Sequence, residues 1–128
     1  MPGKHATALV VDDDDPIRSM LAKIIERLEV DVETARDGAE AITKIESHDY
    51  DVIVLDLMMP HVDGFEVLRY MHEKRPDLIG RTIIASAVPE TEIHRRLGDD
   101  NVFRIHAKPF EMSSLLNDVD ECVKSAAA

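Results

Sequence analysis

Two short runs in this sequence are apolar at every position, and each ends abruptly in aspartate. The first run is residues 8–11, which precede four aspartates, and the second is residues 52–55, which precede Asp56. A strand that faces water on one side alternates apolar and polar residues, whereas a strand covered on both faces does not. The two runs therefore favour a parallel sheet with helices on both faces.

Amphipathic segments alternate with strand-like segments along the rest of the chain. The expected strands are residues 8–11, 30–35, 51–55, 81–85 and 102–107. Asp15 is placed to cap the first helix, with Pro16 at the first helical position and Met20 on the inward stripe. Further helices are expected after the pairs Asp37-Gly38 and Asp63-Gly64, over residues 89–97, and over residues 112–123.

Five alternations of strand and helix predict one α/β domain over residues 1–128, with right-handed crossovers between parallel strands. A chain of 128 residues that is 45% apolar can form one core and has no room for a second domain. We expect Cys122 to belong to that core. Open α/β sheets bind ligands beyond the carboxyl ends of their strands, which is where the acids lie.

The chain carries 26 acidic and 15 basic residues, for a formal net charge of −11. This charge argues against direct nucleic-acid binding and favours docking to other proteins. The sequence begins without the pattern of a signal peptide, and no apolar run approaches the length that spans a bilayer. We therefore expect a cytoplasmic protein without membrane insertion.

Acidic side chains follow two of the predicted strands at the same edge of the sheet. If these strands are neighbours, Asp12, Asp13 and Asp56 converge, and their like charges repel unless a cation neutralises them. Mg²⁺ is favoured, because it prefers oxygen ligands and is commonly held by one or two carboxylates plus a phosphate. We expect Asp13 and Asp56 to bind it, Asp12 mainly through water, with the Met58 backbone carbonyl completing the coordination.

Two further polar residues, Ser86 and Lys108, end the fourth and fifth predicted strands at this edge. A carboxylate such as Asp56 can form an acyl-phosphate, and the transferring phosphoryl group gathers charge on its equatorial oxygens. Lys108 is suited to meet one oxygen as a point charge, and the Ser86 hydroxyl another as a hydrogen-bond donor. The constellation predicts that Asp56 is a phosphorylated nucleophile.

Four motifs occur in order over nearly the whole chain. They are residues 10–13 (Val-Val-Asp-Asp), 55–60 (Leu-Asp-Leu-Met-Met-Pro) with Asp63-Gly64, 84–87 (Ile-Ala-Ser-Ala) and 108–110 (Lys-Pro-Phe). In this combination the chain resembles the receiver domain of two-component response regulators. The resemblance implies a flavodoxin-like, doubly wound five-stranded parallel sheet in the order 2-1-3-4-5 with five helices. It also implies phosphorylation of Asp56 by a sensor histidine kinase or phosphotransfer protein, and a switch in the face of the fourth helix, fifth strand and fifth helix.

Two positions depart from the family pattern. Asn101 stands where a glycine usually precedes the fifth strand, and asparagine tolerates the left-handed region. Ile105 stands where family members commonly carry tyrosine or phenylalanine, and a β-branched aliphatic side chain cannot act as an aromatic rotamer switch. We therefore expect activation to travel from Ser86 through residues 87–90 to the fourth helix, which has few apolar anchors.

Other functions fit the sequence less well. A receiver-fold adaptor that ignores phosphate is disfavoured, because every chemical position is filled. An aspartyl-phosphate phosphatase of the haloacid-dehalogenase class would carry a second acid two residues after Asp56, where this chain has Met58. The acid run lacks the glycine of a calcium loop and places Ile17 at a ligand position. The first strand lacks the glycine-rich turn of a dinucleotide enzyme.

The expected role is that of a phosphoacceptor that assists its own phosphoryl transfer and autodephosphorylation, not that of an enzyme. None of the six histidines lies in a recognisable kinase phosphoacceptor motif, and His61 and His106 are expected to be solvent-exposed near the site. The expected output is docking to a downstream protein that the sequence does not identify, unless the chain is part of a longer regulator.

Overall fold

The computed structural model describes residues 6–98 and 101–127. Within these residues five parallel strands form one sheet in the order β2-β1-β3-β4-β5. The strands are β1 (Ala6–Val11), β2 (Val30–Ala35), β3 (Val52–Leu55), β4 (Thr82–Ser86) and β5 (Arg104–Ala107). The helices are α1 (Asp15–Glu26), α2 (Gly38–Ser47), α3 (Gly64–Lys74), α4 (Glu90–Leu97) and α5 (Met112–Ala127), with a 3₁₀ helix, η1 (Pro76–Arg81). The predicted flavodoxin-like fold and its strand order are confirmed.

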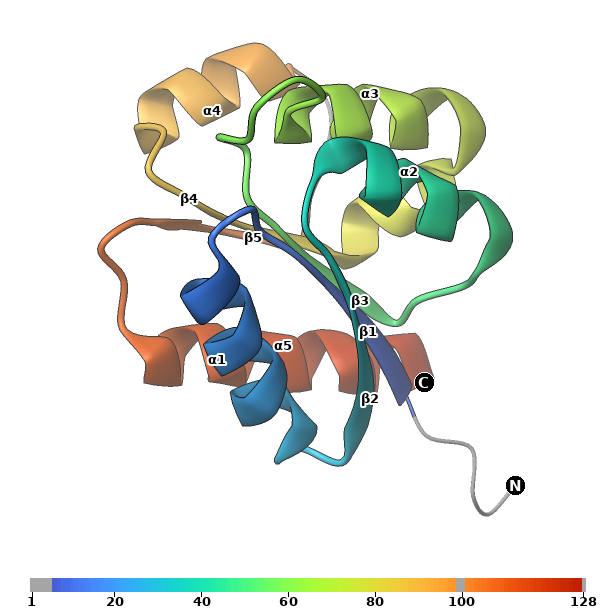
Figure 1. The fold of residues 1–128 in the computed structure, drawn as a ribbon, viewed down its shortest axis with the longest axis vertical. Helices are drawn as coiled ribbons and strands as arrows, with labels where there is room; N and C mark the ends of the chain where they lie inside the picture. The colour runs from blue at the N-terminus through green and yellow to red at the C-terminus, as the bar shows by residue number, and fades with distance from the viewer. Residues whose placement is uncertain (1–5, 99–100, 128) are drawn as a thin grey trace.

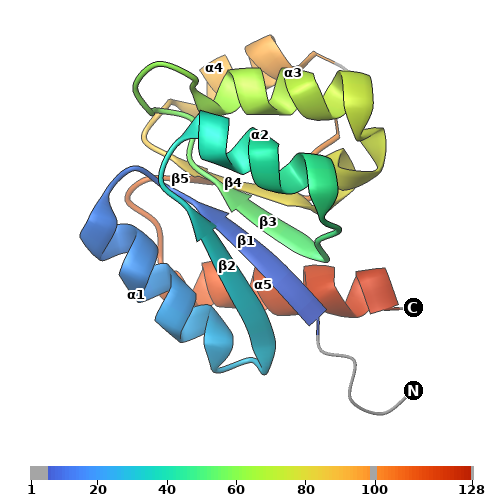
Figure 2. The same ribbon diagram turned by 45° about the vertical axis from the view of Figure 1, so that its right-hand side comes forward.

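Helices cover both faces of the sheet. Helices α1 and α5 lie on one face and α2, α3 and α4 on the other (Figure 1), and the turned view shows the same layers (Figure 2). Along β1, the buried residues Leu9 and Val11 join the core beneath α2, α3 and α4, while Ala8 and Val10 join the core beneath α1 and α5. The continuous apolar run is explained by these two cores.

The register of the central strands sets the level at which the acids emerge. Val11 of β1 lies opposite Leu55 of β3, so Asp12 and Asp56 follow paired residues. The Asp56 N–H also donates to the Val11 carbonyl at 3.0 Å, which extends the pairing by one residue. The two carboxylates therefore leave neighbouring strands side by side.

Helix α1 begins differently from the prediction. Asp14, whose backbone is extended, is the cap, and its side chain accepts a hydrogen bond from the Ile17 N–H at 3.0 Å. Asp15 is already helical and pairs with Arg18, so the prediction of Asp15 as the cap was wrong by one residue. Met20 was expected to face the core but is 44% exposed. It lies at the margin of the apolar face of α1, whose buried residues are Leu21 and Ile25.

Other predicted boundaries agree with the structure within about two residues, except that α5 continues to Ala127, four residues beyond its expected end. Strand β4 ends at Ser86, one residue later than expected, and Ser86 is fully buried. Strand β5 begins at Arg104, two residues later than expected. Cys122 is a core residue as predicted, and burial raises the pKa of its thiol to about 11.

Gly64 starts α3 where the backbone passes close to the end of β3. A Cβ at this position would lie 2.4 Å from the carbonyl oxygen of Asp56 and 2.6 Å from the Leu57 Cα. Both neighbours are backbone atoms, so no side-chain rotation can relieve the overlap. Helix α3 can begin this close to the acids because residue 64 has no side chain.

We expect Gly64→Ala to lower the free energy of unfolding by about 2 kcal/mol, because the methyl group overpacks the backbone. Urea unfolding followed by far-UV circular dichroism measures the change. Gly80→Ala is the matched control, since nothing lies within 4 Å of a Cβ there, and its effect should stay below about 0.5 kcal/mol. Equal unfolding midpoints for the two variants would contradict the steric argument.

Candidate functional site: a carboxylate cluster at the sheet edge

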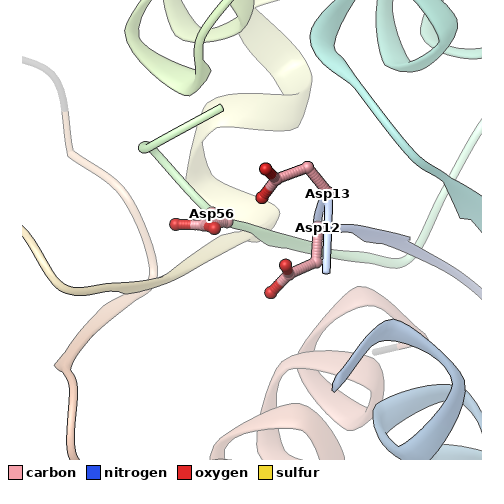
Figure 3. A group of neighbouring side chains, drawn as sticks. All are labelled: Asp12, Asp13 and Asp56. Atoms are coloured by element: carbon pink, nitrogen blue, oxygen red, sulfur yellow. The ribbon is translucent and has the colours of Figure 1, made fainter. Parts of the chain in front are cut away.

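Three carboxylates meet at the carboxyl ends of β1 and β3 (Figure 3). One oxygen from each of Asp12, Asp13 and Asp56 lies within 4.8 Å of the others. Asp12 and Asp56 are only 2% and 5% exposed, whereas Asp13 is exposed. All three side chains point to the same side in the figure. The convergence expected from the sequence is therefore present.

Backbone donors hold the two buried carboxylates in place. The Asp14 N–H donates to Asp12 Oδ1 at 2.9 Å, and the Met58 N–H donates to Asp56 Oδ1 at 3.2 Å. The Arg18 guanidinium donates to the Asp12 carbonyl oxygen at 2.9 Å, which ties α1 to the end of β1. These contacts fix the direction of each carboxylate and leave its second oxygen, Oδ2, for other partners.

Lys108 contributes a positive charge from the end of β5. Its Nζ lies 3.6 Å from Asp12 Oδ2 and 3.8 Å from Asp56 Oδ2. Its backbone N–H donates to the Ser86 carbonyl at 2.7 Å, so β5 stays paired with β4 up to this residue. The ammonium is thus shared between two acids from neighbouring strands.

Ser86 places a buried hydroxyl beside the same carboxylates. Burial raises the pKa of Asp56, and the Ser86 hydroxyl acts against this effect by favouring the ionised carboxylate. The Ser86 Oγ also accepts a hydrogen bond from the Val88 N–H at 3.3 Å, two residues further along the loop to α4. Ser86 therefore connects the acid cluster to the loop that begins α4.

Burial raises the pKa of both Asp12 and Asp56 and is the largest influence on each. The backbone N–H groups of Asp14 and Met58 act in the opposite direction, as does the Lys108 ammonium. The charge of Asp12 raises the pKa of Asp56 further. The ionised pair is therefore only partly compensated, and a bound cation would relieve the remaining repulsion.

The donor set suits a hard divalent cation such as Mg²⁺. Carboxylate oxygens are the ligands that Mg²⁺ prefers, and an open site allows it to retain several waters. Here the Lys108 ammonium pairs with Asp12 and Asp56, and the exposed Asp13 leaves the cluster of three carboxylates open to solvent. Asp12, Asp13 and Asp56 can therefore hold a metal ion. The Met58 carbonyl remains a predicted ligand, since the described contact of this residue is its N–H.

Among the histidines, one expectation was wrong. His106 is not solvent-exposed: its Nε2 lies 2.7 Å from Asp118 Oδ2 on α5. The reason is strand alternation, which turns residue 106 toward the face of the sheet that α5 covers. His61 is exposed as expected, and its backbone has a positive φ of 66°. Asn101 is also exposed, and Gly98, with φ of 60°, is the left-handed residue described near it.

Sequence reasoning missed Arg18, which orients the backbone at Asp12. A signal was available, because a cation in the first turn of a helix opposes the helix dipole and needs another partner. The spacing alone did not show that this partner is a carbonyl at the end of β1. The contact depends on the direction of α1 relative to the sheet, which the spacing of residues does not specify.

Comparison with known sequences identifies the family. The family described as the response regulator receiver domain matches residues 8–120. The chain belongs to this family, and it is a receiver domain of the kind found in two-component response regulators. Such domains are generally not enzymes in the usual sense. Among the described residues, no helix combines the length and apolarity needed to cross a membrane.

Individual relatives agree with this assignment. Response regulator MprA of Mycobacterium avium (strain 104) is 38% identical over 109 residues, which are 84% of this chain and 46% of that protein. The Francisella response regulator 1452 receiver domain is 32% identical with a TM-score of 0.79, covering 94% of this chain and 98% of that one. Response regulator protein TrrA of Thermotoga maritima, solved in complex with Mg(2+)-BeF, is 27% identical with a TM-score of 0.79, covering 91% and 98%. The chain spans less than half the length of the curated relatives it matches.

The raised pKa of Asp56 predicts how stability depends on pH without metal. The fold favours the protonated Asp56 carboxyl. The contribution of this group to the free energy of unfolding is therefore fully present below its ordinary pKa of 3.8, and it is lost as pH rises through the pKa in the folded state. We therefore expect Asp56→Asn to melt higher than the wild type at neutral pH in chelator. A gain of about 1 kcal/mol would raise Tm by about 3–5 °C. The gain should shrink toward acid pH.

Thermal unfolding by circular dichroism at several pH values checks this, with Asp31→Asn as the control. Asp31 is an exposed aspartate on β2, so its variant should melt within about 1 °C of the wild type. Added Mg²⁺ should stabilise the wild type more than Asp56→Asn. A wild type that melts above Asp56→Asn at neutral pH in chelator would show that Asp56 is fully compensated.

Proposed function

We propose that Asp56 is the phosphoacceptor of this receiver domain, which comprises residues 1–128, and that a sensor histidine kinase or phosphotransfer protein phosphorylates it with Mg²⁺. The supporting observation is the placement of Asp56, buried at the end of β3 between two further acids and the Lys108 ammonium. The complex of TrrA with Mg(2+)-BeF supports the same assignment by similarity.

In the proposed step an Asp56 carboxylate oxygen attacks the phosphorus of a phosphohistidine. A P–O bond forms, the P–N bond breaks, and its electron pair leaves with the imidazole, which takes up a proton. The Met58 N–H and the Ser86 hydroxyl favour the ionised nucleophile. Mg²⁺ held by Asp13, Asp56 and the Met58 carbonyl, with Asp12 mainly through water, would neutralise charge on a phosphoryl oxygen.

Lys108 and Ser86 are proposed to contact the product. The Lys108 ammonium lies close enough to Asp56 to pair with a second phosphoryl oxygen, and the Ser86 hydroxyl can donate to a third. These contacts would also steady the group while water attacks phosphorus in autodephosphorylation, which releases inorganic phosphate and restores the Asp56 carboxylate. The domain would assist this reaction without acting on a separate substrate.

Docking to a downstream protein is the proposed output, with the chain acting in the cytoplasm. The net charge of −11 disfavours direct binding of nucleic acid. A phosphate-independent adaptor would have no need of a buried acid pair partly compensated by lysine. A phosphatase of the aspartyl-phosphate type would need an acid at position 58, where this chain has Met58, which is 57% exposed.

We expect a small-molecule phosphodonor to add one phosphoryl group to the chain in the presence of Mg²⁺. Intact-protein mass spectrometry detects the adduct, and excess chelator should abolish it because Asp12, Asp13 and Asp56 then lack their cation. Asp56→Asn should lose the adduct entirely. Asp13→Ala should need about tenfold more Mg²⁺ for the same yield.

Asp77→Asn is the matched control, since Asp77 pairs with Arg75 far along the chain from the cluster and should be phosphorylated like the wild type. A full-yield adduct in Asp56→Asn or in chelator would show that another residue accepts the group. Unchanged Mg²⁺ dependence in Asp13→Ala would show that Asp13 does not take part.

The proposed switch runs from Ser86 to α4. The Val88 N–H already donates to Ser86 Oγ, so a hydroxyl drawn toward the phosphoryl group would take the loop with it. Helix α4 begins after Pro89 without a side-chain cap and is anchored in the core by two buried residues, Ile93 and Leu97. Ile105, in contrast, is paired with Ile84 of β4 and packs against the core beneath α4. Helix α4 therefore has few anchors that resist a shift.

We expect a phosphoryl mimic to change amide hydrogen exchange mainly between residues 87 and 97. Rates there should change by at least about fivefold, with small changes around Ile105, because an aliphatic side chain has no second position to occupy. Exchange measured by mass spectrometry checks this. Ser86→Ala should bind the mimic without the change in α4, and the reverse distribution of changes would rule this route out.

A further inference from the structure

His106 joins β5 to α5 through a short polar contact. Its Nε2 lies 2.7 Å from Asp118 Oδ2, and the two side chains are only 12% and 20% exposed. The preceding residue, Ile105, packs on the other face, against the core beneath α4. The imidazole therefore fixes the α5 side of β5 just before the chain reaches Lys108.

The same ring also contacts the segment that follows Lys108. The Phe110 ring meets the imidazole edge-on, with 5.7 Å between ring centroids and 60° between planes. Ala107, Lys108 and Pro109 lie between these two residues in the chain. The residue before the Lys108 segment is thus in contact with the residue after it, which restricts the movement of the backbone between them.

Joining a strand to a helix through a buried polar pair costs desolvation free energy. Two apolar side chains would cover the same area without the desolvation of a carboxylate and an imidazole. What the hydrogen bond to Asp118 adds is direction, because it fixes the orientation of the His106 ring and so the position of Phe110. Arg104 also approaches Asp118, at 3.7 Å from Oδ1, and pairs with Glu121 at 2.9 Å.

Lys108 needs such support because it comes from the edge of the sheet. Within the described residues β5 pairs with β4 alone, and the Lys108 N–H to the Ser86 carbonyl is its last backbone bond. From there the side chain reaches across to Asp12 and Asp56 on the ends of the central strands. A small tilt of β5 would therefore displace Nζ relative to the acids.

We propose that His106 is a positioning residue for Lys108. By holding Asp118 and Phe110 together, its imidazole keeps the ammonium where it contacts the phosphoryl group on Asp56. The inference rests on the proposed function and extends it, because it assigns a role to a histidine that acts through the lysine.

The test is a double-mutant cycle on the full chain, with beryllofluoride and Mg²⁺ titrated while amide resonances are recorded. His106→Leu keeps the bulk and removes the bond to Asp118, and it should weaken beryllofluoride binding about fivefold. His106→Gln retains a donor and should recover most of the loss. In the Lys108→Ala background, His106→Leu should cause no further loss, because its effect passes through the ammonium.

Arg104→Gln is the matched control, because it removes another link from β5 to α5 without touching Phe110, and it should bind like the wild type. Equal losses in both backgrounds, or wild-type binding by His106→Leu, would overturn the positioning role alone. Asp118→Ala carries the same test if His106→Leu lacks a cooperative thermal transition. A wild-type chain that neither binds beryllofluoride nor forms the phospho-adduct would overturn the proposed function as well.

Discussion

The burial of two neighbouring carboxylates is the constraint on which this structure depends. Asp12 and Asp56 leave neighbouring strands at the same level, and burial raises the pKa of both. The N–H groups of Asp14 and Met58 and the ammonium of Lys108 favour the ionised forms, but the net shift remains upward. A fold selected for stability alone would place apolar side chains there. Perturbed acids of this kind are characteristic of functional sites.

The two proposed phosphate contacts lead to different helices. Ser86 ends β4, and its hydroxyl accepts the Val88 N–H at the start of the loop to α4. Lys108 follows β5, and its segment is joined to α5 through His106 and Asp118. A group bound at Asp56 would therefore act on α4 through a hydrogen bond and on α5 through a packed ring. This arrangement offers a physical route for a signal in a chain that lacks an aromatic residue at position 105.

Sequence patterns predicted the sheet and the acid cluster because both follow from strand burial and from the shared edge of parallel strands. These predictions failed where the outcome depended on the position of a single residue along a helix or on one face of a strand. The cap of α1 is Asp14 instead of Asp15, since four successive aspartates all satisfy the cap preference. His106 faces α5 because of strand alternation, and its partner Asp118 lies 12 residues away on a helix whose orientation the sequence does not specify. The metal ligands and phosphate contacts remain predictions.

The position of β5 at the edge of the sheet has a consequence for the charge balance of the cluster. The acids follow β1 and β3, which are paired on both sides and buried on both faces, so they should separate only when the whole domain unfolds. Lys108 follows a strand of four residues with one neighbour, which can open locally at much lower free energy. The acidic side chains thus stay in place as long as the domain is folded, whereas the lysine belongs to a less stable unit. Brief withdrawal of the lysine would leave the acids in place without their positive partner, and the cluster would then attract a passing cation more strongly.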